Sequence, residues 1–150
     1  MTLVHTIGYE SASLQGFLDT LRSAGVKLLV DVRAVASSRR PGFSKTRLAA
    51  NLAEAGIDYV HLRALGTPAD GRAAARAGRH DEMKAIFKEH LETPAAQDGL
   101  AKLAALVRSE QPLVLLCFEH DPAHCHRSLV AEALTAIVPV RVRHLMPEVE

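Results

Sequence analysis

Short apolar runs alternate along the whole chain with longer segments whose apolar residues recur every three or four positions. Nearly continuous aliphatic runs are typical of strands covered on both faces, whereas the three- to four-residue spacing is typical of amphipathic helices. Parallel strands need crossover connections, and helices of this length supply them. We therefore expect an α/β fold, a three-layer open sheet of about five mainly parallel strands with helices on both faces. The expected strands span residues 3–7, 26–32, 57–62, 113–118 and 138–145.

The chain has the length of one ordinary domain. Independent folding units most often contain about 100–150 residues, and this chain has 150. We find no internal repeat, low-complexity tract or linker, so we expect residues 1–150 to form a single α/β domain. The segment 63–80 contains three Gly, one Pro and four Arg. We interpret it as a loop or lid, with a helical turn at residues 73–77.

The composition is that of a globular protein and argues against a disordered or membrane-spanning chain. Hydrophobic residues make up 48% of the chain and charged residues 23%, which are globular values. The formal net charge is +1, so bulk electrostatics does not demand a nucleic-acid partner, although a local basic patch remains open. No apolar run approaches the roughly 18–20 residues that span a bilayer. We expect no membrane association and a cytoplasmic location.

The fold class predicts where a ligand binds. In open parallel α/β sheets, ligands bind beyond the carboxyl ends of the strands. The unusual residues of this sequence concentrate after four of the expected strands. Their positions are 8–10, 31–40, 61–67 and 117–127.

The segment 117–127 carries the densest chemistry, with two Cys, three His, one Glu, one Asp and one Arg. It follows a strand and leads into a helix, and the first turn of a helix attracts anions and lowers the pKa of a cysteine. We predict a catalytic anion pocket here, with Arg127 holding the anion. The residues that would supply acid, base or nucleophile are Cys117, Glu119, Cys125 and His126.

Two other interpretations of this segment stay open. The first is a metal or redox sensor that uses Cys117, His120, Cys125 and His126, although the eight-residue spacing of the cysteines fits no common zinc pattern. The second is structural: one buried cysteine on a strand and charged residues at the start of a helix.

The segment 31–40 supplies arginines and hydroxyls beyond a second strand. We predict that Arg33, Ser38 and Arg39 bind the same anion as Arg127. The alternative is a solvated loop in which Arg33 pairs with Asp31 or Glu119. Further basic residues after the third strand are candidates for a lid over the pocket. They are His61, Arg63, Arg72, Arg76, Arg79 and His80.

Several short motifs occur in a fixed order along the chain. They are Thr6-Ile7-Gly8, Asp31-Val32-Arg33 with Ser38-Arg39, Leu65-Gly66, and Cys117-Phe118-Glu119 followed by Cys125-His126-Arg127. Together they resemble the bacterial family called domain of unknown function 488, over about residues 6–145. The resemblance implies an α/β fold and a shared polar site, and it supplies no reaction. The chain departs from the usual family pattern at Tyr9, Glu10, Ala36 and Thr67.

We therefore predict an enzyme that acts on a phosphate-bearing substrate, either a nucleotide or a nucleic-acid end. The alternatives are a non-catalytic nucleotide or nucleic-acid binding module, and the metal or redox sensor described above. The sequence assigns no cofactor, no resident metal and no oligomeric state.

Overall fold

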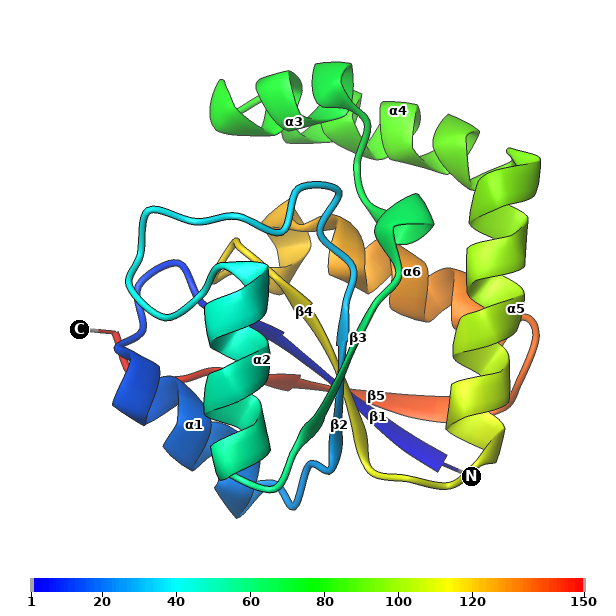
Figure 1. Cartoon of the computed structure of the whole chain (residues 1–150). Helices are drawn as coiled ribbons and strands as arrows, with labels where there is room; N and C mark the ends of the chain where they lie inside the picture. Colours follow the sequence, from blue (N-terminus) through cyan, green and yellow to red (C-terminus); the bar gives the residue numbers. More distant parts are fainter. Residues whose placement is uncertain (1, 150) are drawn as a thin grey trace.

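The computed structural model describes residues 2–149 and contains one parallel five-stranded sheet (Figure 1). The strand order is β3-β2-β4-β1-β5, so β4 lies at the centre of the sheet between β2 and β1, and β3 and β5 form its edges. The α/β prediction is confirmed. The strands are β1 (Thr2–Gly8), β2 (Leu28–Asp31), β3 (Asp58–His61), β4 (Leu113–Cys117) and β5 (Val140–Leu145).

Helices cover both faces of the sheet, as predicted. Helices α1 (Leu14–Ser23) and α2 (Lys45–Glu54) pack on one face, and α5 (Pro94–Arg108) and α6 (His126–Thr135) pack on the other (Figure 1). Ser13 begins α1 as an N-cap whose side chain accepts a hydrogen bond from the backbone N–H of Gly16. Within residues 2–149, no helix has both the length and the apolar character needed to cross a bilayer.

The central strand β4 shows why the apolar runs are continuous. Leu113 and Leu115 belong to the core under α5 and α6, while Val114 and Leu116 belong to the core under α1 and α2. All four side chains are buried. Since successive side chains of a strand point to opposite faces, a strand between two helical layers needs apolar residues at every position.

Residues 63–80 differ from the expected loop. They contain a short 3-10 helix at Arg63–Leu65 and a regular helix, α3 (Ala69–Arg76), and α4 (His80–Leu91) follows after a short turn. Alanine favours the helix, and Gly78 ends it in the left-handed conformation at φ +79°. The buried face of α3 consists of Gly71 and Ala74. These residues are too small to produce the repeat of large apolar residues by which a helix is recognised in a sequence. Figure 1 shows α3 and α4 together at the top of the molecule.

The strand register brings the carboxyl ends of the central strands together. Gly8 at the end of β1 pairs with Cys117 at the end of β4, and Asp31 at the end of β2 pairs with Leu116. The segments that follow these three strands therefore start side by side at one edge of the sheet. This edge carries the candidate site.

Candidate functional site

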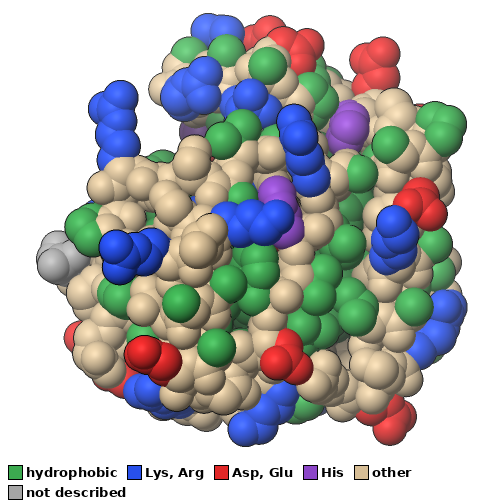
Figure 2. Space-filling view, viewed as in Figure 1, with side chains coloured by type: hydrophobic (Ala, Val, Ile, Leu, Met, Phe, Trp, Pro, Cys, Tyr) green, Lys and Arg blue, Asp and Glu red, His purple; other side chains and the backbone are tan. Residues whose placement is uncertain are grey.

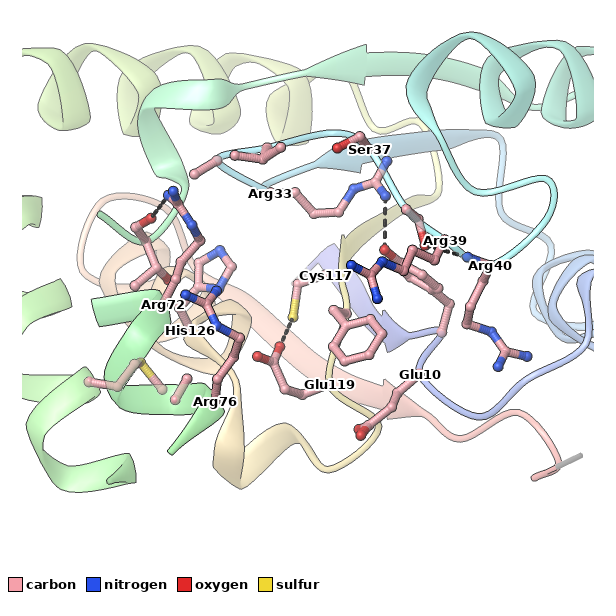
Figure 3. Close-up of a pocket in the computed structure, with 18 residues that line it drawn as sticks. Glu10, Arg33, Ser37, Arg39, Arg40, Arg72, Arg76, Cys117, Glu119 and His126 are labelled. Atoms are coloured by element: carbon pink, nitrogen blue, oxygen red, sulfur yellow. Dashed lines mark hydrogen bonds between the residues drawn. The ribbon is translucent and has the colours of Figure 1, made fainter. Parts of the chain in front are cut away.

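A cavity of about 690 Å³ lies at the carboxyl ends of β2 and β4, between the loop after β2 and helix α3 (Figure 3). Its volume falls within the range of about 300–1,000 Å³ that is typical of small-molecule sites. Basic side chains dominate its charged lining, and Figure 2 shows Lys and Arg side chains concentrated on the upper part of one face. The charged lining residues are Arg33, Arg39, Arg40, Arg72, Arg76, Glu10 and Glu119.

Most of the residues predicted for the site line this cavity, and two do not. The lining includes Cys117, Glu119, His126, Arg33, Ser38 and Arg39, together with Arg72 and Arg76 from the expected basic lid. Cys125 and Arg127 are not part of the lining; Cys125 is 1% exposed and Arg127 is 0% exposed. Both lie behind the cavity wall.

The side chain of Arg127 forms hydrogen bonds to groups inside the protein. Its Nε donates to Thr6 Oγ1 at 3.1 Å, and its Nη2 donates to the carbonyl of His120 at 3.2 Å. Its Nη1 donates to the carbonyl of Glu119 at 2.6 Å and contacts Cys117 Sγ at 3.5 Å. Burial lowers the pKa of Arg127 to about 10, so the side chain stays charged at neutral pH. Through these hydrogen bonds, Arg127 connects the loop after β4 to strand β1.

Gly8 makes room for this loop. A Cβ atom at this position would collide with the carbonyl oxygen of Glu119 and would lie 2.9 Å from Nη1 of Arg127. Only a residue without a side chain lets the loop backbone approach β1 so closely. The segment Thr6-Ile7-Gly8 thus supports Arg127 from two sides, through the Thr6 hydroxyl and the open space at Gly8.

Arg33 forms an ion pair with Asp31, one of the two partners named in the alternative, but the pair is buried and not part of a solvated loop. Nη2 of Arg33 lies 2.8 Å from Oδ2 of Asp31, and Nε donates to Oδ1 at 2.9 Å. Tyr59 donates its hydroxyl to Asp31 Oδ2 at 2.5 Å, while Arg33 Nη1 donates to the Phe43 carbonyl and to the Tyr9 hydroxyl. Burial acts to lower the pKa of Arg33, but hydrogen bonds and the charge of Asp31 raise it overall. The charge of Arg33 is therefore balanced by Asp31.

The remaining arginines supply the net positive charge. Nη1 of Arg72 donates to the Thr67 carbonyl at 2.9 Å, and Arg40 donates to the Ala12 carbonyl. Arg39 and Arg76 are exposed, and in the part of the chain that the structure describes their side chains form no hydrogen bond or ion pair. Figure 3 shows them on the two sides of Cys117, one from the loop after β2 and the other from α3.

The two cysteines are joined as a disulfide at the base of the cavity. Cys117 is the last residue of β4, and Cys125 is the N-cap of α6. The backbone N–H of Arg127 donates to Cys125 Sγ at 3.5 Å, so both sulfur atoms contact Arg127. Cys117 Sγ also lies 3.3 Å from Oε2 of Glu119 (Figure 3). Burial raises the pKa of the Glu119 carboxyl.

His126 is held in one tautomer. Its Nε2 lies 2.7 Å from the carbonyl oxygen of Val32, and because a carbonyl can only accept, Nε2 carries the proton. The other nitrogen, Nδ1, is an acceptor that lies 3.8 Å from Cys125 Sγ. Burial lowers the pKa of His126 to about 4, so the ring is neutral at physiological pH.

One group of side chains could hold a metal ion. The ligand atoms of Cys117, Cys125 and His126 all lie within 4.8 Å of one another. Two thiolates and an imidazole suit zinc or another soft cation, provided that the cysteines are reduced. His120, included in the metal interpretation of the sequence, lies outside this group.

Two residues of the site, Thr6 and Glu10, are absent from the predicted set. Thr6 is fully buried in β1, and a threonine inside an aliphatic run is the signal that points to it. Glu10 lines the cavity, and its Oε1 accepts a hydrogen bond from the backbone N–H of His120 at 3.0 Å. Tyr9, another departure from the family pattern, stacks on Phe43 with ring centroids 4.5 Å apart.

Comparison with known proteins identifies a family and no individual relative. Neither the curated proteins nor the solved structures gave a match. A family model described as Domain of unknown function DUF488 matches residues 13–134, which is more than half of the chain and includes β2, β3, β4 and all six α-helices except the last residue of α6. The chain therefore belongs to the family Domain of unknown function DUF488.

Proposed function

We propose that the protein is an enzyme that binds a phosphate-bearing substrate, a nucleotide or a nucleic-acid end, in the basic cavity. One observation carries this proposal: Arg39 and Arg76, from segments far apart in the sequence, line the same cavity as Cys117 and Glu119. Guanidinium groups form bidentate, charge-assisted hydrogen bonds with phosphate oxygens. An anion between the two arginines would lie over the reactive side chains.

The state of the arginines supports anion binding. Asp31 already balances Arg33, so Arg33 contributes little free charge. The side chains of Arg39 and Arg76 make no hydrogen bond to other residues in the range 2–149, and both can turn toward a ligand. Arg72 lies on α3 one turn before Arg76 and its guanidinium is oriented by the Thr67 carbonyl. We therefore assign phosphate binding to Arg39, Arg72 and Arg76, and assign to Arg127 the positioning of the loop that carries Glu119.

Glu119 is the acid–base group that we propose for this cavity. Its carboxyl lines the cavity, and burial raises its pKa. A raised pKa lets a carboxyl keep its proton to a higher pH than usual, which favours a role as a general acid. His126 is a weaker candidate because its neutral ring has Nε2 bonded to the Val32 carbonyl.

Calorimetric titration tests the binding part of this proposal. We expect inorganic phosphate, a nucleoside monophosphate and a 5′-phosphorylated oligonucleotide to bind, and the matching 5′-hydroxyl oligonucleotide to bind more weakly. Arg39→Ala and Arg76→Ala should each weaken phosphate binding about tenfold, since a hydrogen bond to a charged group contributes about 1.5 kcal/mol or more. Binding should also weaken as salt is added.

The exposed Arg141 on β5 offers a matched control, because Arg141→Ala removes the same charge outside the cavity. Equal binding by the wild type, Arg39→Ala and Arg76→Ala would contradict the proposed anion site. Phosphate binding with no turnover of any phosphorylated ligand would favour the non-catalytic binding module instead.

A further inference from the structure

We propose that Cys117 and Cys125 form a redox-active pair that exchanges electrons with a thiol carrying phosphate or carboxylate groups, and that Cys117 is the sulfur attacked. Three observations carry this inference. The two sulfurs are paired. Of the two cysteines, Cys117 lines the cavity and Cys125 does not. The pair has a polar environment made by Arg127 and Glu119.

The two cysteines are equally buried, at 1% exposed, but of the two only Cys117 lines the cavity. Cys117 lies at the end of β4 with its sulfur toward the cavity, as Figure 3 shows. Cys125 is the N-cap of α6 and lies behind Cys117. An incoming thiolate entering through the cavity therefore meets Cys117 first. Attack on Cys117 makes Cys125 the leaving sulfur.

The site stabilises Cys125 as a leaving group. Its sulfur accepts the backbone N–H of Arg127 in the first turn of α6. A helix N-terminus lowers the pKa of a cysteine thiol, and a thiol with a lower pKa leaves faster in thiol–disulfide exchange. The Arg127 guanidinium contacts Cys117 Sγ at 3.5 Å, so its charge favours the departure of Cys117 as a thiolate in the second step of the exchange.

The reaction balances in two steps. In the first, a thiol RSH attacks the disulfide; a bond forms between its sulfur and Cys117, the Cys117–Cys125 bond breaks, and Cys125 ends as a thiol that carries the proton RSH has lost. In the second, another RSH attacks the sulfur of the bound RS group. RSSR leaves, and Cys117 ends as a thiol with the second proton. Two thiols are oxidised to one disulfide, and the protein disulfide is reduced by two electrons.

Glu119 serves the second step. Its Oε2 lies 3.3 Å from Cys117 Sγ, close enough to deliver a proton to the departing Cys117 thiolate. Glu119 also lines the cavity, so it can take a proton back from the incoming thiol or from water. Its burial keeps the protonated form available.

The anionic class of the thiol rests on the proposed function of the cavity. Arg39 and Arg76 lie on the path to Cys117, and both can hold an anionic group on the incoming thiol. Two reagents of similar size separate this requirement from the exchange reaction itself. One is 2-mercaptoethanesulfonate, which is anionic, and the other is 2-mercaptoethanol, which is neutral.

Thiol exchange can be measured cleanly because the chain has only two cysteines. Mass spectrometry after alkylation reports the disulfide, the dithiol and any mixed disulfide. We expect the oxidised wild type to be reduced reversibly in a thiol buffer. Cys125→Ser, treated with the disulfide of 2-mercaptoethanesulfonate, should accumulate a mixed disulfide at Cys117. Cys117→Ser should react at least tenfold more slowly, and circular dichroism checks that both variants fold.

Three results would overturn the exchange reaction. The first is a disulfide that resists thiols in the native protein and reacts only after unfolding. The second is equal trapping by the two serine variants. The third is reduced protein that retains stoichiometric zinc through gel filtration and does not form the disulfide again, which would assign the cysteines and His126 to a metal site.

A separate comparison tests the anionic class. After correction for thiolate fraction, 2-mercaptoethanesulfonate should reduce the wild type about tenfold faster than 2-mercaptoethanol does, and Arg39→Ala with Arg76→Ala should remove this preference. Equal rates in the wild type would overturn the anionic class, and with it the role of the arginines. Reduction by the neutral thiol would still measure exchange at the cysteine pair. A failure of the anionic class can therefore be distinguished from a failure of the exchange reaction.

Discussion

The guanidinium of Arg127 donates to the backbone carbonyl of Glu119 at 2.6 Å, so a fully buried charge holds the loop that carries the acidic side chain of the cavity. The same guanidinium contacts Cys117 Sγ and the Thr6 hydroxyl. Arg127 therefore links three segments, β1, the end of β4 and the loop that follows it. This relationship gives the first prediction.

Replacing Arg127 with alanine should destabilise the protein strongly. The change leaves the carbonyls of Glu119 and His120 without their donor inside the protein, and each such group costs about 1–3 kcal/mol. We expect a loss of about 3 kcal/mol or more in the free energy of unfolding, measured by urea denaturation. Arg76→Ala, at an exposed position of α3, is the control and should change stability by less than about 0.5 kcal/mol. Similar losses in the two variants would contradict the buried role of Arg127.

Stability should fall as pH decreases from about 6.5 towards 4, because of His126. Burial lowers the pKa of His126 to about 4, so in this window the unfolded chain binds a proton that the folded chain does not. The stabilisation is complete above the unfolded pKa and lost as pH falls through the folded value. At about 1.4 kcal/mol for each pKa unit, the loss is about 3 kcal/mol.

The contribution of His126 is isolated by comparison with His126→Gln in urea denaturation from pH 7 to pH 4.5. The variant lacks this titration, so its stability should depend less on pH. Glu119 acts in the opposite direction, because burial raises its pKa and the folded state binds its proton more tightly. Since both proteins contain Glu119, the difference between them removes its effect. Parallel pH curves would show that His126 does not titrate as expected.

Gly66→Ala should disturb the packing of the segment after β3 against the loop after β2. A Cβ atom at Gly66 would collide with the backbone nitrogen and Cα of Ala34, and a backbone cannot rotate away as a long side chain can. We expect a loss of about 1–3 kcal/mol in unfolding free energy. Gly16→Ala in α1 is the control: its Cβ meets only the Ser13 hydroxyl, at 3.0 Å, and alanine favours a helix. A tolerated Gly66→Ala would show that Ala34 can shift.

Loss of the Tyr59 hydrogen bond and loss of the negative charge of Asp31 should differ in their effect on stability. Tyr59→Phe removes one hydrogen bond to Oδ2 but leaves the ion pair with Arg33, so we expect a loss of about 1 kcal/mol. Asp31→Asn leaves the Arg33 charge buried without its counterion, and we expect a loss of about 3–5 kcal/mol. Thermal or urea unfolding measures both. Equal losses would contradict this ordering.

The fold was largely predictable from local patterns, because a strand between two helical layers must be aliphatic at every position. Serine N-caps and the left-handed Gly25 and Gly56 mark helix ends in the sequence as they do in the structure. The strand order was not predicted, since periodicity reports which face is buried and not which strand is the neighbour. Helix α3 was missed because its buried face consists of small residues.

The position of the candidate site could be predicted from the sequence, but the roles of its individual residues could be predicted less well. The rule that ligands bind at strand ends predicted a polar cluster there, and Cys117, Glu119 and Arg39 line one cavity. Predicting that Arg127 is buried requires a different sequence pattern, the helical spacing of the apolar residues that follow it. Arg127 stands three, four and seven residues before Val130, Ala131 and Leu134, which form the buried face of α6. A charge in that position indicates an internal contact, and only coordinates identify its partners.

The lining of the cavity is divided between two kinds of element, and this division has a consequence for engineering. Arg72 and Arg76 belong to α3, an alanine-rich helix beside the sheet edge, whereas the sulfurs and Glu119 depend on β4 and its loop. Under the function proposed above, substitutions on α3 would alter which anion is bound while the proposed reacting groups stay in place. Engineering of a new specificity would then begin at residues 69–76.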